Sequence, residues 1–486
     1  KKYLKESNRT TGIFIPDEKP DRAEIPDPPV VNDLVKEYQG KEAIAMGEEF
    51  DPSPENIESR TEKVINKSDV DYALLTKETR GDAVVARISL RYGDLESLKG
   101  KQNIGSITAS MLDKGTQNYS RQQIQDKLDA LKAVVRISGS ATGTSVRIET
   151  ERKNLPEVMD LVMDMLKNPT FPAEEFDKLK EENLAYYESQ KSEPTALANI
   201  KFSRLMNPHP KDHPSYTMTF DEEIESLENM KLDEIKSFYN NFYGANNATV
   251  AVVGDFDDKQ MEEMIKSNLQ GWNSKAKYAR IKSEFKEVEA ANEMINTPDK
   301  ANAMFFAGQK VQMRDDNPDY AAMIMGNFML GGGFLNSRLA TRIRQQEGLS
   351  YGVGSWFNAD EQDDVAMFGS YAIYAPENVQ KLEAAYKEEI QKVLTEGFTA
   401  KELEDAKNGW LQQQVVNRSQ DSRLVGQLNS NLYLGRDMMW DKKLEESVQN
   451  LTVEDINKAF KKYIDLDKFI FVKAGDFEKH FGVSKP

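Results

Sequence analysis

The chain contains no cysteine and only three histidines, and both shortages narrow the chemistry open to it. Without cysteine it cannot build a disulfide framework, a thiolate metal site, an iron–sulfur cluster or a cysteine nucleophile. A site for a metal ion or for acid–base catalysis must therefore use His209, His213, His480 or the carboxylates.

Positive charge is also in short supply, with 64 Lys and Arg residues against 81 Asp and Glu and a formal net charge of −17. Phosphates bind to a net basic face, so we expect no nucleic-acid partner. The longest mostly apolar stretch, residues 321–334, is interrupted by glycines and an asparagine. It is shorter than the ~20 apolar residues that a membrane-spanning helix needs, so we expect no membrane span.

The first 60 residues are typical of a linker. Seven of the 18 prolines lie there, and proline fixes φ and removes a backbone donor. We therefore expect an extended, irregular segment over residues 1–60, in which residues 11–15 form a lone strand that needs a sheet from elsewhere.

Regular patterns begin after this linker and then recur. Alternating polar and apolar residues predict half-buried strands near 86–92 and 146–149, and helical periodicity predicts a helix capped by Ser120 and a long charged helix over 173–191. Thr249–Phe256 (TVAVVGDF) matches Ile470–Phe477 (IFVKAGDF), and the helices before them match at the same separation. The sequence thus predicts an α+β fold of two tandem homologous α/β-sandwich domains of about 200 residues, 61–272 and 273–486, after the Pro-rich linker.

Residues 330–354 of the second repeat carry the densest local signal. Three consecutive glycines allow positive φ and close approach of another backbone, and Phe334 follows them. The candidate substrate-binding residues are therefore Gly331, Gly332, Gly333 and Phe334. No Gly-Lys-Ser/Thr follows the glycines, which argues against a phosphate loop.

The same stretch continues with Arg338, Arg342 and Arg344 on an expected short helix that ends at Gly348. Tyr351 then begins a strand. Guanidinium groups and a phenol beside a glycine turn could hold a peptide backbone or an oxyanion. The plainer alternative is a tight turn with solvated arginines.

His209 and His213 lie four residues apart in the stretch NPHPKDHP. A zinc pair with this spacing needs a helix, which the three interspersed prolines forbid. We interpret the stretch as a rigid loop with exposed histidines. A self-sufficient peptidase built on this pair is retained as an alternative.

The chain resembles the insulinase-type zinc metallopeptidases of the M16 (pitrilysin) family over nearly all its length. Met111–Thr116 (MLDKGT) matches the Met-Leu-x-x-Gly-Thr stretch that follows the family's His-x-x-Glu-His zinc motif. The resemblance places the metal-binding positions at Ser106 and Ser110 and the general base at Ala109. Serine is a poor zinc ligand and alanine accepts no proton, so we expect no metal in this chain. A zinc ion is expected instead in a partner half with the intact motif.

In this family two halves, each a pair of α+β domains, close around a peptide chamber. The resemblance assigns Arg344 and Tyr351 to the segment whose arginine and tyrosine reach across that chamber to the substrate. It implies the C-terminal, zinc-less half of a zinc metalloendopeptidase, inactive alone. The alternative is a non-catalytic scaffold or binding subunit, as in the core subunits of the respiratory bc1 complex.

Residues 7–16 also resemble the tail of a preceding catalytic half. The resemblance therefore implies a zinc-bearing partner half, in the same longer chain or as a separate subunit, and a peptide substrate. Bacterial relatives of this type are often exported, which favours the periplasm, with the cytoplasm as the alternative. Without its partner, the chain could form a homodimer through the exposed chamber face.

Overall fold

The computed structural model describes residue 12 and residues 46–65 and 70–481. The chain divides into two units, 1–45 and 46–486, and the fold described here is that of the second. The predicted strand at 11–15, most of the predicted linker and the tail of a preceding half lie outside the described residues. Those interpretations stay predictions.

The last part of the predicted linker is a helix rather than an irregular segment. Helix α2 (Pro54–Arg60) begins after Ser53, whose side chain accepts a hydrogen bond from the N–H of Asn56. Pro54 stands in the first turn, where its missing N–H removes no helical hydrogen bond. Ile57 is fully buried in a core shared with the first sheet. The proline that argued for an extended chain starts a helix here.

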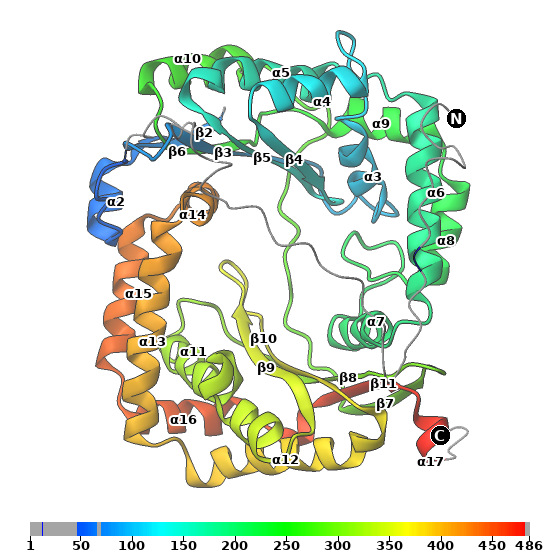
Figure 1. Ribbon diagram of the computed structural model, residues 1–486, viewed down its shortest axis with the longest axis vertical. Helices are drawn as coiled ribbons and strands as arrows, with labels where there is room; N and C mark the ends of the chain where they lie inside the picture. The colour runs from blue at the N-terminus through cyan, green and yellow to red at the C-terminus, as the bar shows by residue number, and fades with distance from the viewer. Residues whose placement is uncertain (1–11, 13–45, 66–69, 482–486) are drawn as a thin grey trace, which may run out of the picture. The chain divides into compact units, whose positions relative to one another are not determined.

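Two β-sheets, one in each repeat, confirm the predicted α+β fold (Figure 1). The first sheet has the strand order β1-β2-β6-β3-β5-β4 and the second β7-β11-β8-β10-β9. In each sheet one pair is parallel, β2 with β6 and β7 with β11, and the other neighbours are antiparallel. The strands are β1 (Glu62–Val64), β2 (Asp71–Thr76), β3 (Ala83–Arg91), β4 (Val134–Gly139), β5 (Gly143–Glu151), β6 (Thr249–Gly254), β7 (Ala291–Asn296), β8 (Ala303–Val311), β9 (Ser350–Ala359), β10 (Ala366–Tyr374) and β11 (Ile470–Gly475).

Helices of the first repeat cover one face of the first sheet. Their apolar stripes form one core with the inward side chains of the strands, and Ser120 caps α4 in a capping box, as predicted. The helices of this repeat are α3 (Ile104–Met111), α4 (Arg121–Ala130), α5 (Leu155–Lys167), α6 (Ala173–Gln190), α7 (Pro194–Met206), α8 (Phe220–Asn229), α9 (Leu232–Phe242) and α10 (Asp258–Leu269), of which α7 packs instead on the second sheet.

The second sheet is covered in the same way, and its core includes two π-helical turns, η3 (Phe328–Gly332) and η5 (Ala340–Gln346). The helices of this repeat are α11 (Tyr320–Asn327), α12 (Val379–Glu396), α13 (Ala400–Ser419), α14 (Asp421–Leu434), α15 (Met438–Asn450), α16 (Val453–Tyr463) and α17 (Phe477–Phe481), of which α14 packs instead on the first sheet. Short 3-10 turns are η2 (Arg152–Asn154), η4 (Phe334–Asn336), η6 (Pro376–Asn378) and η7 (Leu466–Lys468). Of the described helices, none is both long and apolar enough to cross a membrane.

One helix from each repeat packs on the sheet of the other. Helix α14 lies on β2, β6 and β3, and α7 lies on β11, β8 and β7. The crossing helices leave part of each sheet open, since Arg136 and Ser138 on β4 and Tyr371 on β10 remain exposed. Each repeat therefore contributes a helix to a hydrophobic core of the other repeat, so the two repeats are not independently packed units.

Candidate functional site

The positions expected to bind zinc are used for local structure. On α3 the Ser106 hydroxyl donates to the Asn103 carbonyl at 2.7 Å, and the Ser110 hydroxyl donates to the Ser106 carbonyl at 3.0 Å. Such bonds tie a serine to the backbone of its own helix. Ala109 is fully buried against β4, where a Cβ on Gly139 would lie 2.5 Å from the Ala109 Cβ.

These residues do not fit a zinc ion, which takes imidazole, thiolate or carboxylate ligands. On helix α6 downstream, the glutamates that could have supplied a third ligand are exposed at the surface (Glu181, Glu182 and Glu188). Within the described part of the chain, no three His, Asp or Glu side chains come together as a metal site. No catalytic step through zinc can be assigned to these residues.

The three glycines do not form the expected turn of positive φ. Helix α11 continues into η3, and none of Gly331, Gly332 and Gly333 has a positive φ. Glycine is needed here for close packing instead. A Cβ on Gly331 would lie 2.5 Å from the Ser355 hydroxyl oxygen and 2.6 Å from its backbone nitrogen on β9. Gly331 is buried and Gly332 exposed. The substrate contact expected of Gly331–Phe334 stays a prediction.

Arg338 is bound firmly to the neighbouring helix α13. Its guanidinium donates to both carboxylate oxygens of Glu402, at 2.6 and 2.9 Å, and to the Gly397 carbonyl at 2.9 Å. Burial alone would raise the pKa of Glu402, but hydrogen bonds from Arg338 and Thr399 outweigh it and lower the pKa to about 2. Arg338 therefore holds the segment in place and is not the solvated side chain of the plainer interpretation.

The other two arginines of this segment differ from each other. Arg342, half-buried on η5, pairs with Glu347 at 2.8 Å and Glu388 at 2.9 Å. Arg344 is exposed and makes no hydrogen bond or ion pair with the described residues. Of the three guanidinium groups, Arg344 alone is left available to an external group.

Tyr351 lies in a β-bulge at the start of β9. Strand β10 pairs Ile373 with Gly352 and Tyr374 with Ser350, so Tyr351 has no opposite residue. Its side chain is 59% exposed and has no partner within the described chain. The Ser350 hydroxyl donates to the Ile373 carbonyl at 2.6 Å and accepts from the Gly352 N–H at 3.1 Å. Bulges re-aim side chains and are frequent beside active sites.

Arg344 and Tyr351 thus stand on adjacent elements, because η5 packs against β9. Ser350, which holds the bulge, was missed by sequence reasoning. Its only signal was its place directly before Tyr351, and the bulge itself depends on pairing with a strand further along the chain.

The histidine stretch differs from the expected exposed loop. The rings of His209 and His213 stack at 4.2 Å with an interplanar angle of 8°, and both are half-buried. The Ser215 N–H donates to Nδ1 of His213 at 3.0 Å. Burial lowers the pKa of both histidines and nearby positive charge lowers it further, while Asp212 partly offsets the change at His213. No third His, Asp or Glu of the described residues completes a metal site with them.

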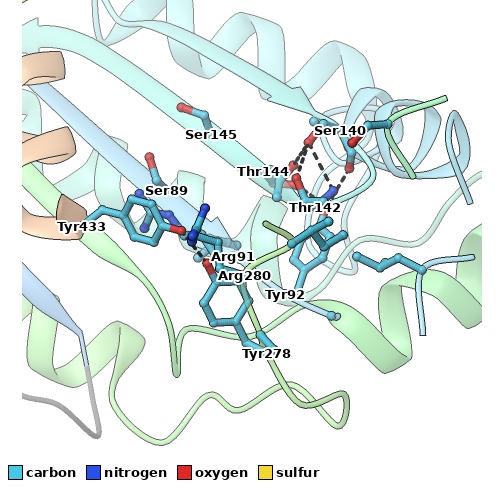
Figure 2. A pocket seen from close by; sticks show the side chains of 18 of the residues that line it. Ser89, Arg91, Tyr92, Ser140, Thr142, Thr144, Ser145, Tyr278, Arg280 and Tyr433 are labelled. Carbon is cyan, nitrogen blue, oxygen red and sulfur yellow. Dashed lines mark hydrogen bonds between the residues drawn. The ribbon is translucent and has the colours of Figure 1, made fainter. Parts of the chain in front are cut away.

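A cavity of about 540 Å³ opens at the ends of β3, β4 and β5 and was not predicted from the sequence. Figure 2 shows Arg91 beside the ring of Tyr433, 3.9 Å from its centroid. The Tyr433 hydroxyl also lies 2.9 Å from that of Tyr278. Hydroxyl groups line much of the remaining wall (Ser89, Ser138, Ser140, Thr142, Thr144 and Ser145). The segments that line this cavity are far apart in the sequence. The alternation of Arg and Ser along the strands was the one sequence pattern that could have indicated the cavity.

Comparison with known proteins places the whole arrangement in a family. The model of the insulinase peptidase family M16 matches residues 74–214, and that of the peptidase M16 inactive domain matches 229–409. The non-peptidase homolog YmxG of Helicobacter pylori is 23% identical over 398 residues, covering 81% of this chain and 89% of its own. An uncharacterized zinc protease YmxG of Bacillus subtilis is also 23% identical, covering 73% of this chain and 83% of its own.

Solved structures agree on the fold. A peptidase M16 inactive domain from Pseudomonas fluorescens gives a TM-score of 0.74 at 23% identity, over 85% of this chain and 97% of that one. The periplasmic protease PqqL of Escherichia coli gives 0.68 at 13% identity, over 89% of this chain but 46% of that one. Because the two family models match adjoining parts of the chain and the duplicated topology agrees with these structures, the chain belongs to the insulinase-type M16 peptidase family.

Proposed function

We propose that this chain is the zinc-less half of an M16-type zinc metalloendopeptidase and forms one wall of a peptide-degrading chamber. A partner half, fused or separate, carries zinc and its ligands. This chain supplies Arg344 and Tyr351 to the substrate. One observation carries the proposal: Arg338 and Arg342 are tied down by carboxylates, whereas Arg344 and Tyr351 are exposed and have no partner among the described residues.

The two side chains suit the stabilisation of a peptide carbonyl during hydrolysis. A guanidinium and a phenol both donate hydrogen bonds, and such donors act best when they are held in place before the reaction. Ser350 holds the bulge beneath Tyr351, and the Arg338–Glu402 pair anchors the segment that leads to Arg344. These contacts anchor the backbone that carries the two donor side chains.

The test is peptide hydrolysis by the complex of this chain with a chain that carries His-x-x-Glu-His. We expect Arg344→Ala or Tyr351→Phe to lower kcat by about 10²–10³-fold, the cost of losing one oxyanion donor. The melting temperature should change little, because both side chains are exposed and neither makes a hydrogen bond or ion pair with the described residues. Hydrolysis at the wild-type rate by both variants would refute the proposed role.

Matched controls separate this role from a general effect of surface substitution. Arg121→Ala on α4 removes an exposed arginine that pairs with Glu175, and Tyr186→Phe on α6 removes a phenol that is 56% exposed, against 59% for Tyr351. Both controls should leave hydrolysis unchanged.

Gel filtration of the chain alone and with its partner tests whether a homodimer forms when the partner is missing.

A second candidate function is a non-catalytic scaffold. It is favoured by the hydroxyls of Ser106 and Ser110, which bond to their own helix instead of a metal, and by the name of the H. pylori relative. Recovery of a stable complex that lacks any His-x-x-Glu-His chain would favour the scaffold.

A periplasmic location is also proposed, and cell fractionation with periplasmic and cytoplasmic markers tests it.

A further inference from the structure

Three arginines form a row on the face of the first sheet that α14 partly covers. Strand pairing sets Arg87 on β3 opposite Arg147 on β5, and Arg147 opposite Arg136 on β4. Side chains alternate between the faces of a strand, and the flanking residues Ile88 and Val146 belong to the helix-covered core. The three arginines therefore lie on the other face, and neighbouring strands are only ~4.8 Å apart.

This row is costly for the fold by itself. Like charges directly opposite each other in a sheet repel. Positive charge is scarce in this chain, whose formal net charge is −17, yet three arginines gather here. Only Arg147 has a carboxylate partner, Glu149 at 2.6 Å. Arg87 and Arg136 form no ion pair within the described residues. The Nε atoms of Arg87 and Arg147 are buried without a hydrogen-bond partner. Two of the three arginines therefore lack a counter-charge among the described residues.

The row is open to an approaching molecule at its Arg136 end, whereas Arg87 at the other end is half-buried beside α14. Strand β4 is the edge of the sheet and Arg136 on it is exposed. Next to the row runs a second row of hydroxyls, in which strand pairing sets Ser89 beside Ser145 and Ser145 beside Ser138. These serines line the cavity of Figure 2, and Arg91 on β3 lines it too. A basic track thus leads from the sheet edge into a polar cavity.

We propose that the arginine row of Arg87, Arg147 and Arg136 binds acidic side chains of an extended polypeptide. Carboxylates accept paired hydrogen bonds from guanidinium groups. The row extends over about 10 Å across three strands, which suits carboxylates on separate residues better than one phosphate. A nucleic acid carries a phosphate on every nucleotide, so the net charge of −17 repels it more strongly than a peptide with a few carboxylates. The inference rests on the proposed function only in that the chain handles polypeptides.

Binding to the isolated chain tests this inference without any partner or hydrolysis. Fluorescence anisotropy compares a labelled peptide that has alternating glutamates with its twin in which glutamine replaces each glutamate. We expect the glutamate peptide to bind at least about tenfold more tightly at low salt, since charge-assisted hydrogen bonds are the strong ones. Added salt should remove that preference. Equal binding of the two peptides would overturn the inference.

Variants locate the binding. Arg136→Gln removes an exposed, unpaired side chain and should fold normally, and Arg136→Gln with Arg147→Gln removes two members of the row. Both should lose the preference for glutamate and melt no lower than the wild type, because repulsion is relieved. Arg121→Gln, on a helix of the opposite face, should keep the preference. A preference that survives in the double variant overturns the assignment.

Two further outcomes separate the possibilities. A single-stranded oligonucleotide that binds more tightly than the glutamate peptide, and only when the row is intact, would replace the polypeptide by a nucleic acid. If the glutamate preference fails while the complex still hydrolyses peptides through Arg344 and Tyr351, only the further inference is wrong. If the glutamate preference holds while Arg344→Ala and Tyr351→Phe leave hydrolysis unchanged, the proposed function is wrong and the acidic-peptide site remains.

Discussion

At the scale of single residues, Glu402 couples stability to the candidate site. Its folded pKa of about 2 lies below the ordinary value of 4.5. The carboxylate therefore stabilises the fold above about pH 4.5, and that stabilisation is lost as the pH falls towards 2. We predict that Glu402→Gln lowers the free energy of unfolding by about 1–2 kcal/mol at neutral pH, a value reduced for partial exposure. Urea denaturation measures it.

The pH dependence distinguishes this role from simple loss of packing. The deficit of Glu402→Gln relative to wild type should shrink as the pH is lowered from 4.5 towards 2. Glu404→Gln, an exposed neighbour on α13 without a partner in the described chain, is the control and should change little. A Glu402→Gln deficit that is constant with pH would contradict the assignment.

The zinc positions give a second prediction at this scale. After dialysis, elemental analysis should find far less than one zinc per chain, because Ser106 and Ser110 offer hydroxyls that already bond to backbone carbonyls. A ratio near one would contradict this expectation. In that case His209→Ala, which breaks the stacked histidine pair, should abolish binding if that pair is the site.

At the scale of elements, the junction of η3 and β9 decides the shape of the candidate site. The Cβ of an alanine at 331 would lie under 3 Å from Ser355, and the backbone must move to admit it. We predict that Gly331→Ala lowers the free energy of unfolding by about 1–3 kcal/mol, as overpacking does. Thermal denaturation followed by circular dichroism measures the change.

The matched control is Gly352→Ala on the same strand. A Cβ there meets only the Cδ1 atom of Ile373, at 3.8 Å, which is ordinary contact. Its effect should be within about 0.5 kcal/mol, as for substitutions away from packed features. Equal losses for both variants would show that β9 merely disfavours side chains and that the approach of η3 has no special role.

At the scale of the whole molecule, the exchange of α7 and α14 joins the two repeats into one folding unit. Asn429 on α14 is buried and accepts hydrogen bonds from the hydroxyls of Ser89 and Thr249, while donating to the carbonyls of Arg87 and Thr249. We predict that Asn429→Ala costs about 1–3 kcal/mol by leaving these groups unsatisfied. Both repeats should still melt in a single transition.

Calorimetry and limited proteolysis check this prediction. One calorimetric peak that moves to lower temperature, and fragments from both repeats that arise together, are the expected results. Asn431→Ala on the same helix, whose buried side chain donates a hydrogen bond to the sulfur of Met438 in its own repeat, is the control for a change in α14 itself. Two separate peaks in Asn429→Ala would show that the repeats fold independently.

The sequence by itself determined the α+β class, the duplication and most of the helix and strand positions. These follow from local causes, such as the alternation along β3 and β5 and the Ser120 cap, which act within a few residues. It also determined that the zinc donors are missing, since that depends only on which residues occupy positions 106, 109 and 110.

Only the tertiary structure decided which groups are available. Arg338, Arg342 and Arg344 look alike in the sequence, and their difference comes from carboxylates on α12 and α13. The bulge at Tyr351 depends on pairing with β10, and the arginine row depends on the register of three strands. Partners that are distant in the chain and meet only on folding leave no periodic signal, which is why the sequence could not indicate them.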